Sequence, residues 1–199
     1  MKKQTLLVVL AVFAFAPMAF SQISGGIRLG VNLSNEKYDV EGFSLSPDSK
    51  LGLMGGLYLT ASLSDKIAIQ PELHFSSMGS KLDVLGEEFK TKLSYLSVPV
   101  LLRYNISENF NIQVGPQLGF LVSAKGEANG DSEDIKDDYK GIDFGAAIGL
   151  GVDFGKINGG VRYVAGLSNT SDVSSDGVDL TVKNNAFQIF VGYRLFGGE

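Results

Sequence analysis

Cysteine is absent from the 199 residues of this chain, and proline is scarce, with five residues. Without cysteine, neither a disulfide framework nor a thiolate metal site can form, so the fold must depend on hydrogen bonding and packing. No proline-rich or low-complexity linker divides the chain. We therefore expect a single domain after any leader is removed.

Basic residues are also in short supply, with 17 against 22 acidic residues and a net charge of −5. This balance argues against nucleic-acid binding and against docking onto an anionic surface by charge alone. We expect no nucleic-acid partner.

Long apolar runs are missing, except for one at the N-terminus. Lys2 and Lys3 precede an apolar core at residues 6–16, and a small-x-small cleavage site ends at Ser21, before Gln22. This pattern predicts a secretory signal peptide over residues 1–21 and a mature domain over residues 22–199. Since no other run approaches the length of a membrane helix, any membrane span would have to be made of strands.

Residues 139–155, YKGIDFGAAIGLGVDFG, alternate between an apolar face and a face of glycine, alanine and aspartate. A period of two is the side-chain repeat of a strand. The pattern recurs along the chain, and the predicted strands cover residues 24–34, 50–63, 67–76, 93–104, 110–123, 139–155, 157–168 and 187–195. Pro99 predicts a bulge or irregular pairing in the fourth of these strands.

The connections between these strands alternate between long and short. The long ones cover residues 35–49, 79–92, 125–138 and 169–184. An even strand count with short turns at one end is typical of outer-membrane barrels. We predict an all-β, eight-stranded antiparallel transmembrane up-and-down barrel, with four long extracellular loops, three short periplasmic turns and both termini in the periplasm.

Alternation alone fits a soluble lipocalin-like barrel equally well, because that fold is apolar inside and polar outside. The polar face here, however, is poor in lysine and glutamate and carries most of the strand glycines. Glycine gathers where space is short, which in an eight-stranded barrel is the interior. We therefore assign the polar face to the lumen and the apolar face to lipid.

All four arginines of the chain, Arg28, Arg103, Arg162 and Arg194, lie on the predicted inner face. Arginine suits confined, multiply hydrogen-bonded pairing, and the acidic residues of that face are Glu72, Asp143 and Asp153. We predict a lumenal ion-pair network in two clusters, one containing Arg28, Glu72 and Arg162 and the other Asp153, Arg194 and Arg103. Such a plug would leave no open channel.

Other polar residues on the same face are predicted to complete the lumen, namely His74, Gln70, Gln113, Gln117 and Gln188. His74, the only histidine, is open to two interpretations: a hydrogen-bonded lumen residue, which we favour, or the catalytic histidine of an acyltransferase barrel. No catalytic constellation is evident, and we predict no enzyme activity, cofactor or metal.

The acidic stretch at residues 131–138 is likewise open to two interpretations. It fits no EF-hand spacing, and a solvated surface loop is favoured over a calcium-binding loop.

Several segments resemble the outer-membrane β-barrel family of Bacteroidetes that includes PorT and its "porin family" relatives. The resembling residues are IQPEL at 69–73, YLSVPVLLRY at 95–104, VGPQLG at 114–119, Arg162-Tyr163 with Gly166-Leu167 and Asn169, and VGYRLF at 191–196. The resemblance spans the mature chain and implies insertion into the outer membrane, with an architecture similar to the small OmpA and OmpX barrels. The chain ends in Gly197-Gly198-Glu199 rather than in the aromatic residue usual for barrel-assembly signals.

The function favoured at this point is a non-enzymatic outer-membrane scaffold that presents its loops to an extracellular or secretion-system partner. The alternatives are a narrow passive channel, a PorT-like accessory protein of a secretion system and a lipid-modifying barrel enzyme. The expected partners are outer-membrane lipids and, during insertion, the barrel-assembly machinery. We expect a monomer.

Overall fold

The computed structural model describes residues 23–40, 43–84, 87–128, 131–172 and 180–197. The predicted signal peptide lies outside these residues. No helix in this part of the chain is long and apolar enough to cross a membrane.

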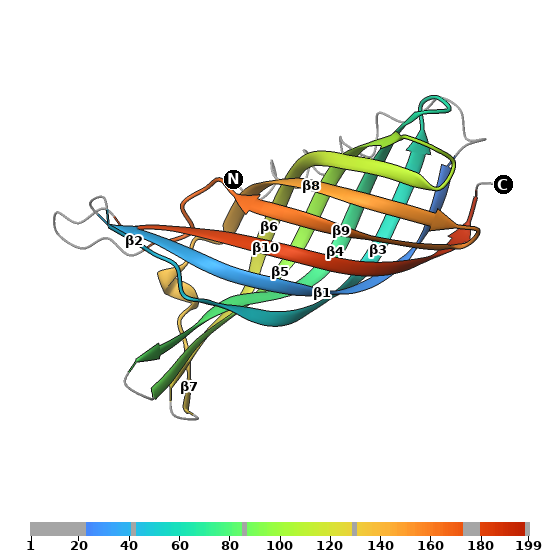
Figure 1. Ribbon diagram of the computed structural model, residues 1–199. Helices are drawn as coiled ribbons and strands as arrows, with labels where there is room; N and C mark the ends of the chain where they lie inside the picture. Colours follow the sequence, from blue (N-terminus) through green and yellow to red (C-terminus); the bar gives the residue numbers. More distant parts are fainter. Residues whose placement is uncertain (1–22, 41–42, 85–86, 129–130, 173–179, 198–199) are drawn as a thin grey trace, which may run out of the picture.

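Eight long antiparallel strands form a closed ring (Figure 1). They are β1 (Ile23–Val40), β3 (Asp48–Ser62), β4 (Ile67–Val84), β5 (Glu87–Asn105), β6 (Phe110–Ala128), β8 (Ile142–Phe154), β9 (Ile157–Gly166) and β10 (Leu180–Phe196). Each pairs with its neighbour in sequence, and β10 pairs with β1 to close the ring. The predicted eight-stranded up-and-down barrel is confirmed.

Among the described residues, three short elements lie at the end of the barrel opposite the short turns. They are β2 (Phe43–Leu45), which pairs with β1, β7 (Asp131–Asp134), which pairs with β6, and the 3-10 turn η2 (Lys136–Asp138). The strands extend well into the ranges predicted as long loops: β4 and β5 stay paired to Val84 and Glu87. Backbone pairing satisfies N–H and C=O groups regardless of side-chain polarity, so these polar segments form projecting hairpins.

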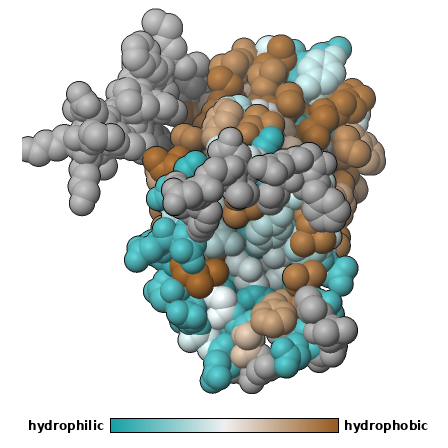
Figure 2. Space-filling model, turned by 90° about the vertical axis from the view of Figure 1, so that its left-hand side faces the viewer, coloured by the Kyte–Doolittle hydropathy of each residue, from teal (hydrophilic) through white to brown (hydrophobic). Residues whose placement is uncertain are grey.

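The two faces of the strands separate as predicted. Leu53 is 70% exposed, whereas the next residue, Met54, is 3% exposed. Large apolar side chains cover the outside of the barrel, while the inside holds polar residues, among them Arg28, Glu72 and Arg162. Figure 2 shows hydrophobic side chains over the upper part of the molecule and hydrophilic ones toward the lower end. An apolar exterior around a polar interior is typical of barrels that cross a lipid bilayer.

The predicted irregularity in β5 lies on both sides of Pro99. The β5–β6 register shifts between Ser94 and Tyr95, and the ladder is interrupted between Pro99, opposite Gln117, and Leu102, opposite Val114. The skipped residues Val100 and Leu101 lie opposite Pro116 and Gly115 of β6, and Pro116 has no N–H to donate to this ladder.

Glycine on the inner face allows neighbouring strands to approach closely. A Cβ at Gly56 would lie 1.9 Å from the backbone oxygen of Leu73 on β4, whereas a Cβ at Gly141 would meet nothing within 4 Å.

We predict that Gly56→Ala lowers the free energy of unfolding by roughly 1 to 3 kcal/mol, because the backbones of β3 and β4 must move apart. Urea unfolding of the barrel in lipid vesicles measures the change, with Gly141→Ala as the matched control. Equal stability of the two variants would contradict the close approach.

Candidate functional site in the barrel lumen

The carboxylate of Glu72, on β4, accepts hydrogen bonds from residues of three strands. Arg162 Nη1 and Nη2 on β9 lie 2.9 Å from Oε2 and Oε1, and Arg28 Nη1 on β1 lies 2.5 Å from Oε1. Gln70 Nε2 lies 2.5 Å from Oε1 and His74 Nε2 2.6 Å from Oε2. The Glu72 and Arg162 side chains are 0% exposed, so this is a buried, bidentate ion pair with a second arginine attached.

Aromatic rings cover the two guanidinium groups. The Arg28 Cζ lies 4.1 Å from the centroid of the Phe190 ring and 4.7 Å from that of Tyr58, and the Arg162 Cζ lies 5.1 Å from Phe190. Cation–π contacts of this kind favour a cation that is removed from water. Two guanidinium groups share one carboxylate, so one positive charge has no negative partner within this cluster, and the aromatic rings stabilise it.

A chain of amides connects this cluster to a second ion pair nearer the short turns. Arg162 Nη2 donates to Gln113 Oε1 at 2.9 Å, Gln113 Nε2 donates to Asn111 Oδ1 at 2.8 Å, and Asn111 Nδ2 donates to Asp153 Oδ2 at 2.9 Å. Asp153 pairs with Arg103 at 2.5 Å. The two clusters expected from the sequence are thus one continuous network.

Two residues predicted for this network bond to groups outside it. Asp143 accepts hydrogen bonds from Ser168 Oγ at 2.8 Å and Asn184 Nδ2 at 2.9 Å, both neutral donors. It stands near the start of β8, whereas Arg162 pairs opposite Gly149, further along that strand, so the two charges lie at different depths. Arg194 lines the same cavity as Asp153 and Arg103, as predicted for the second cluster, and its Nη2 donates to the backbone oxygen of Gly155 at 2.7 Å.

The remaining predicted lumen residues are buried inside the barrel. Gln188 Nε2 donates to Asn32 Oδ1 at 3.1 Å, and Gln117 is 8% exposed. Gln70, His74 and Gln113 contact the ionic network directly.

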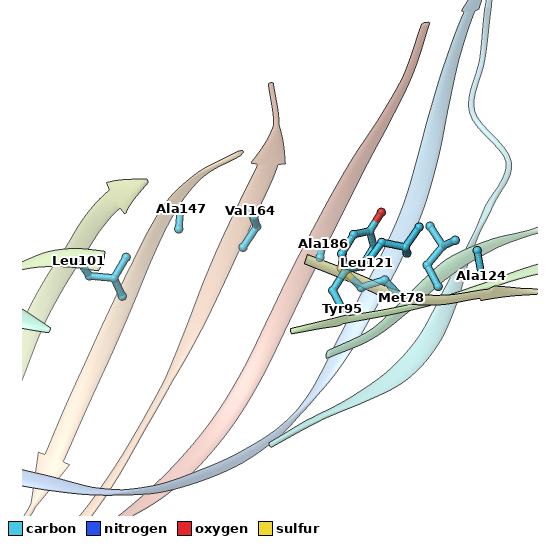
Figure 3. Close-up of a cluster of buried hydrophobic side chains, with 9 residues drawn as sticks. Met78, Tyr95, Leu101, Leu121, Ala124, Ala147, Val164 and Ala186 are labelled. Carbon is cyan, nitrogen blue, oxygen red and sulfur yellow. The ribbon is translucent and has the colours of Figure 1, made fainter. Parts of the chain in front are cut away.

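An apolar layer lies next to the ionic network, mostly on the hairpin side of Glu72, although Leu101 lies opposite Gln70 on the short-turn side. It consists of the inward-facing side chains Met78, Leu93, Tyr95, Leu101, Leu121, Ala124, Ala147, Val164 and Ala186. Figure 3 shows them projecting from strands around the barrel. The sequence carries a signal for part of this layer, because residues 96–102, LSVPVLL, are mostly apolar at both odd and even positions.

Sequence reasoning missed a buried acid, Glu36, which is 0% exposed. Ser80 Oγ and the Tyr139 hydroxyl donate to its carboxylate at 2.7 and 2.8 Å. Burial and the nearby Glu36 raise the pKa of Tyr139, which keeps its hydroxyl protonated as a donor. The sequence did contain a signal for Glu36. Side chains of a strand alternate in direction, so Glu36 points inward like Asn32 and Ser34 once β1 continues beyond its predicted end at residue 34.

Two larger cavities lie at the ends of the lumen. The one at the short-turn end has a volume of about 520 Å³ and a polar lining that includes Arg103, Asp153 and Arg194. The one at the hairpin end measures about 490 Å³ and is lined by residues of β1, β2, β4, β5, β6 and β7. Between them, the cavity beside Tyr95 and Gln117 has a volume of about 10 Å³.

Residues 131–138 do not form the loop expected of them, since they make up β7 and η2. Within the described part of the chain, no three His, Asp or Glu residues are grouped so that they could hold a metal ion.

The fold and the lumen together define a transmembrane β-barrel of the bacterial outer-membrane type. Residues 15–172 match the model of the outer membrane protein beta-barrel domain family, and the chain belongs to this family. No curated protein sequence matches the chain.

Solved structures of outer-membrane barrels resemble the chain at low sequence identity. Ail, the attachment invasion locus protein of Yersinia pestis, is 17% identical with a TM-score of 0.50, over 87% of this chain and 99% of Ail. Neisserial surface protein A is 10% identical with a TM-score of 0.49, over 84% and 96% of the two chains. OprG of Pseudomonas aeruginosa is 16% identical with a TM-score of 0.36, over 88% and 95%. At these identities, the likeness to Ail supports the fold alone.

We predict that Glu72→Ala lowers the free energy of unfolding by roughly 3 to 5 kcal/mol, because it leaves two buried arginines without their carboxylate. Urea unfolding in vesicles and heat resistance on a gel both report the change. Glu108→Ala, in an exposed turn, is the control. Wild-type heat resistance in Glu72→Ala would refute the structural importance of the pair.

The second ion pair is expected to contribute less. The Arg103 and Asp153 side chains are 15% and 27% exposed, so water screens their attraction. Asp153→Asn should lower the free energy of unfolding by less than about 1 kcal/mol. A loss as large as that of Glu72→Ala in the same urea titration would contradict this ranking.

Proposed function

We propose that this chain is a non-enzymatic outer-membrane scaffold whose lumen is closed and whose hairpins present a binding surface to the exterior. The observation that carries the proposal is the five-fold coordination of the Glu72 carboxylate, which ties β1, β4 and β9 together across the lumen. A cross-link of this kind suits a rigid support better than a pore.

The orientation follows from the connections. β1 begins and β10 ends at the end of the barrel that carries the short turns (Figure 1). Short turns face the periplasm in barrels of this class, so we place both termini there and the β4–β5 and β6–β7 hairpins outside the cell. In this proposal, export depends on the signal peptide over residues 1–21, and insertion depends on the barrel-assembly machinery. The protein is a monomer whose apolar outer belt contacts the lipid of the outer membrane.

A lipid-modifying enzyme is disfavoured by the position of His74. Its side chain is 0% exposed, and Nε2 is engaged by Glu72, whose carboxylate is shared with two arginines. A general base needs reach to its substrate, and this ring lies inside the barrel, away from lipid.

The PorT-like role in secretion shares the same geometry as the scaffold. Exposed hairpins and a closed lumen would serve an accessory protein equally well. Affinity capture of the tagged barrel from cross-linked membranes, followed by identification of bound proteins, distinguishes this role from a free-standing scaffold.

We predict that the purified wild-type barrel shows no stepwise ion conductance in a planar lipid bilayer, because the ionic network and the apolar layer fill the lumen. An open porin incorporated into the same bilayer is the positive control. Stable unitary steps from the wild type would favour the channel alternative instead.

A further inference from the structure

The sheet opens between β2 and β4 at the outer end of the barrel. The β3–β4 ladder ends at Asp48 opposite Lys81, next to Pro47, which has no backbone N–H to donate. Beyond this point β2 follows β1, while β4 follows β5 with Leu82 opposite Phe89. Figure 1 shows the β2 end and the β4–β5 end diverging.

An apolar pocket lies at this opening. It is the cavity of about 490 Å³, and its apolar lining includes Tyr38, Leu45, Pro47, Leu82, Phe89 and Ile135. Leu45 and Phe89 are 43% and 40% exposed. Large apolar side chains on a hairpin beyond the lipid belt mark an interaction site rather than a packed core.

The charges around the pocket have one prevailing sign. Glu127, Asp131 and Glu133 line it together with Lys90, and because Glu127 pairs with Lys92, the acidic side chains that remain for a ligand are Asp131 and Glu133. All four residues of β7, including Asp131 and Glu133, are exposed. A ligand with apolar side chains next to positive charges complements this lining.

We propose that the opening between β2 and β4 is a docking site for an extended, basic segment of a partner protein. The segment adds as a strand to the edge of β2, so main-chain hydrogen bonds hold it, while alternate apolar side chains enter the pocket. Lysine or arginine side chains of the same segment face Asp131 and Glu133. This inference rests on the proposed function, since it names the partner chemistry of the exterior hairpins.

The test uses the full mature barrel in detergent micelles and a fluorescent peptide of alternating valine and lysine. Saturable binding by fluorescence anisotropy is the expected result. Two control peptides separate the contributions: glutamate in place of lysine removes the charge complementarity, and N-methylation of alternate amides removes the main-chain donors. Both should bind more weakly than the parent peptide.

Matched variants locate the site. Asp131→Lys with Glu133→Lys should weaken binding about tenfold or more, since like charges then face each other. Glu108→Lys, at the other end of the barrel, should leave binding unchanged. Leu82→Ser should weaken binding, and Leu63→Ser, in a short turn, should not.

Three outcomes would overturn the proposal. They are the absence of saturable binding, equal binding by the N-methylated peptide, and equal affinity in the hairpin variants and their controls. Dimerisation of the barrel through this edge, seen by sedimentation and abolished by Leu82→Ser, would assign the opening to a second copy and also overturn it. Ion conductance would refute the closed scaffold separately, because peptide binding does not report on the lumen.

Discussion

The shared carboxylate of Glu72 is the contact on which the interior of this barrel depends. Removing an ion from water costs several kcal/mol even in a relaxed protein, so two buried arginines require compensation. Five hydrogen bonds to one carboxylate and the ring of Phe190 provide it. The residues come from different strands, and only the ring closed by β1 and β10 brings them face to face.

The lumen has two kinds of filling, and each suits its position. Ionic and amide groups occupy the half near the short turns, where a polar cavity admits solvent to Arg103 and Asp153. The apolar layer around Tyr95 and Val164 lies toward the hairpins. Above it, Glu36 and Tyr139 close the interior, and the exterior pocket begins at Tyr38 and Ser80. The barrel is therefore a filled support beneath a structured outer surface.

Much of this arrangement could be predicted from the sequence. Period-two alternation identified all eight long strands, and glycine and arginine on one face assigned that face to the lumen. The level of Arg28, Glu72 and Arg162 followed from counting residues up from the short turns. The same counting placed Arg194 at the level of Asp153 and Arg103, and all three line one cavity. It could not supply the partners of Asp143, because it ignores the stagger between strands. Glu36 was missed because a polar stretch reads as a loop, although backbone pairing continues through it.

The sequence by itself determined which face of each strand points inward. Side-chain direction alternates with every residue, so a shift of one residue would turn the apolar, lipid-facing side chains into the lumen. Tertiary structure alone decided which inward residues meet. Strands in a barrel are tilted and staggered, so partners are selected by shear as well as by depth along the chain. Glu72 consequently meets Arg28 and Arg162, whereas Asp143 meets Asn184 and Ser168.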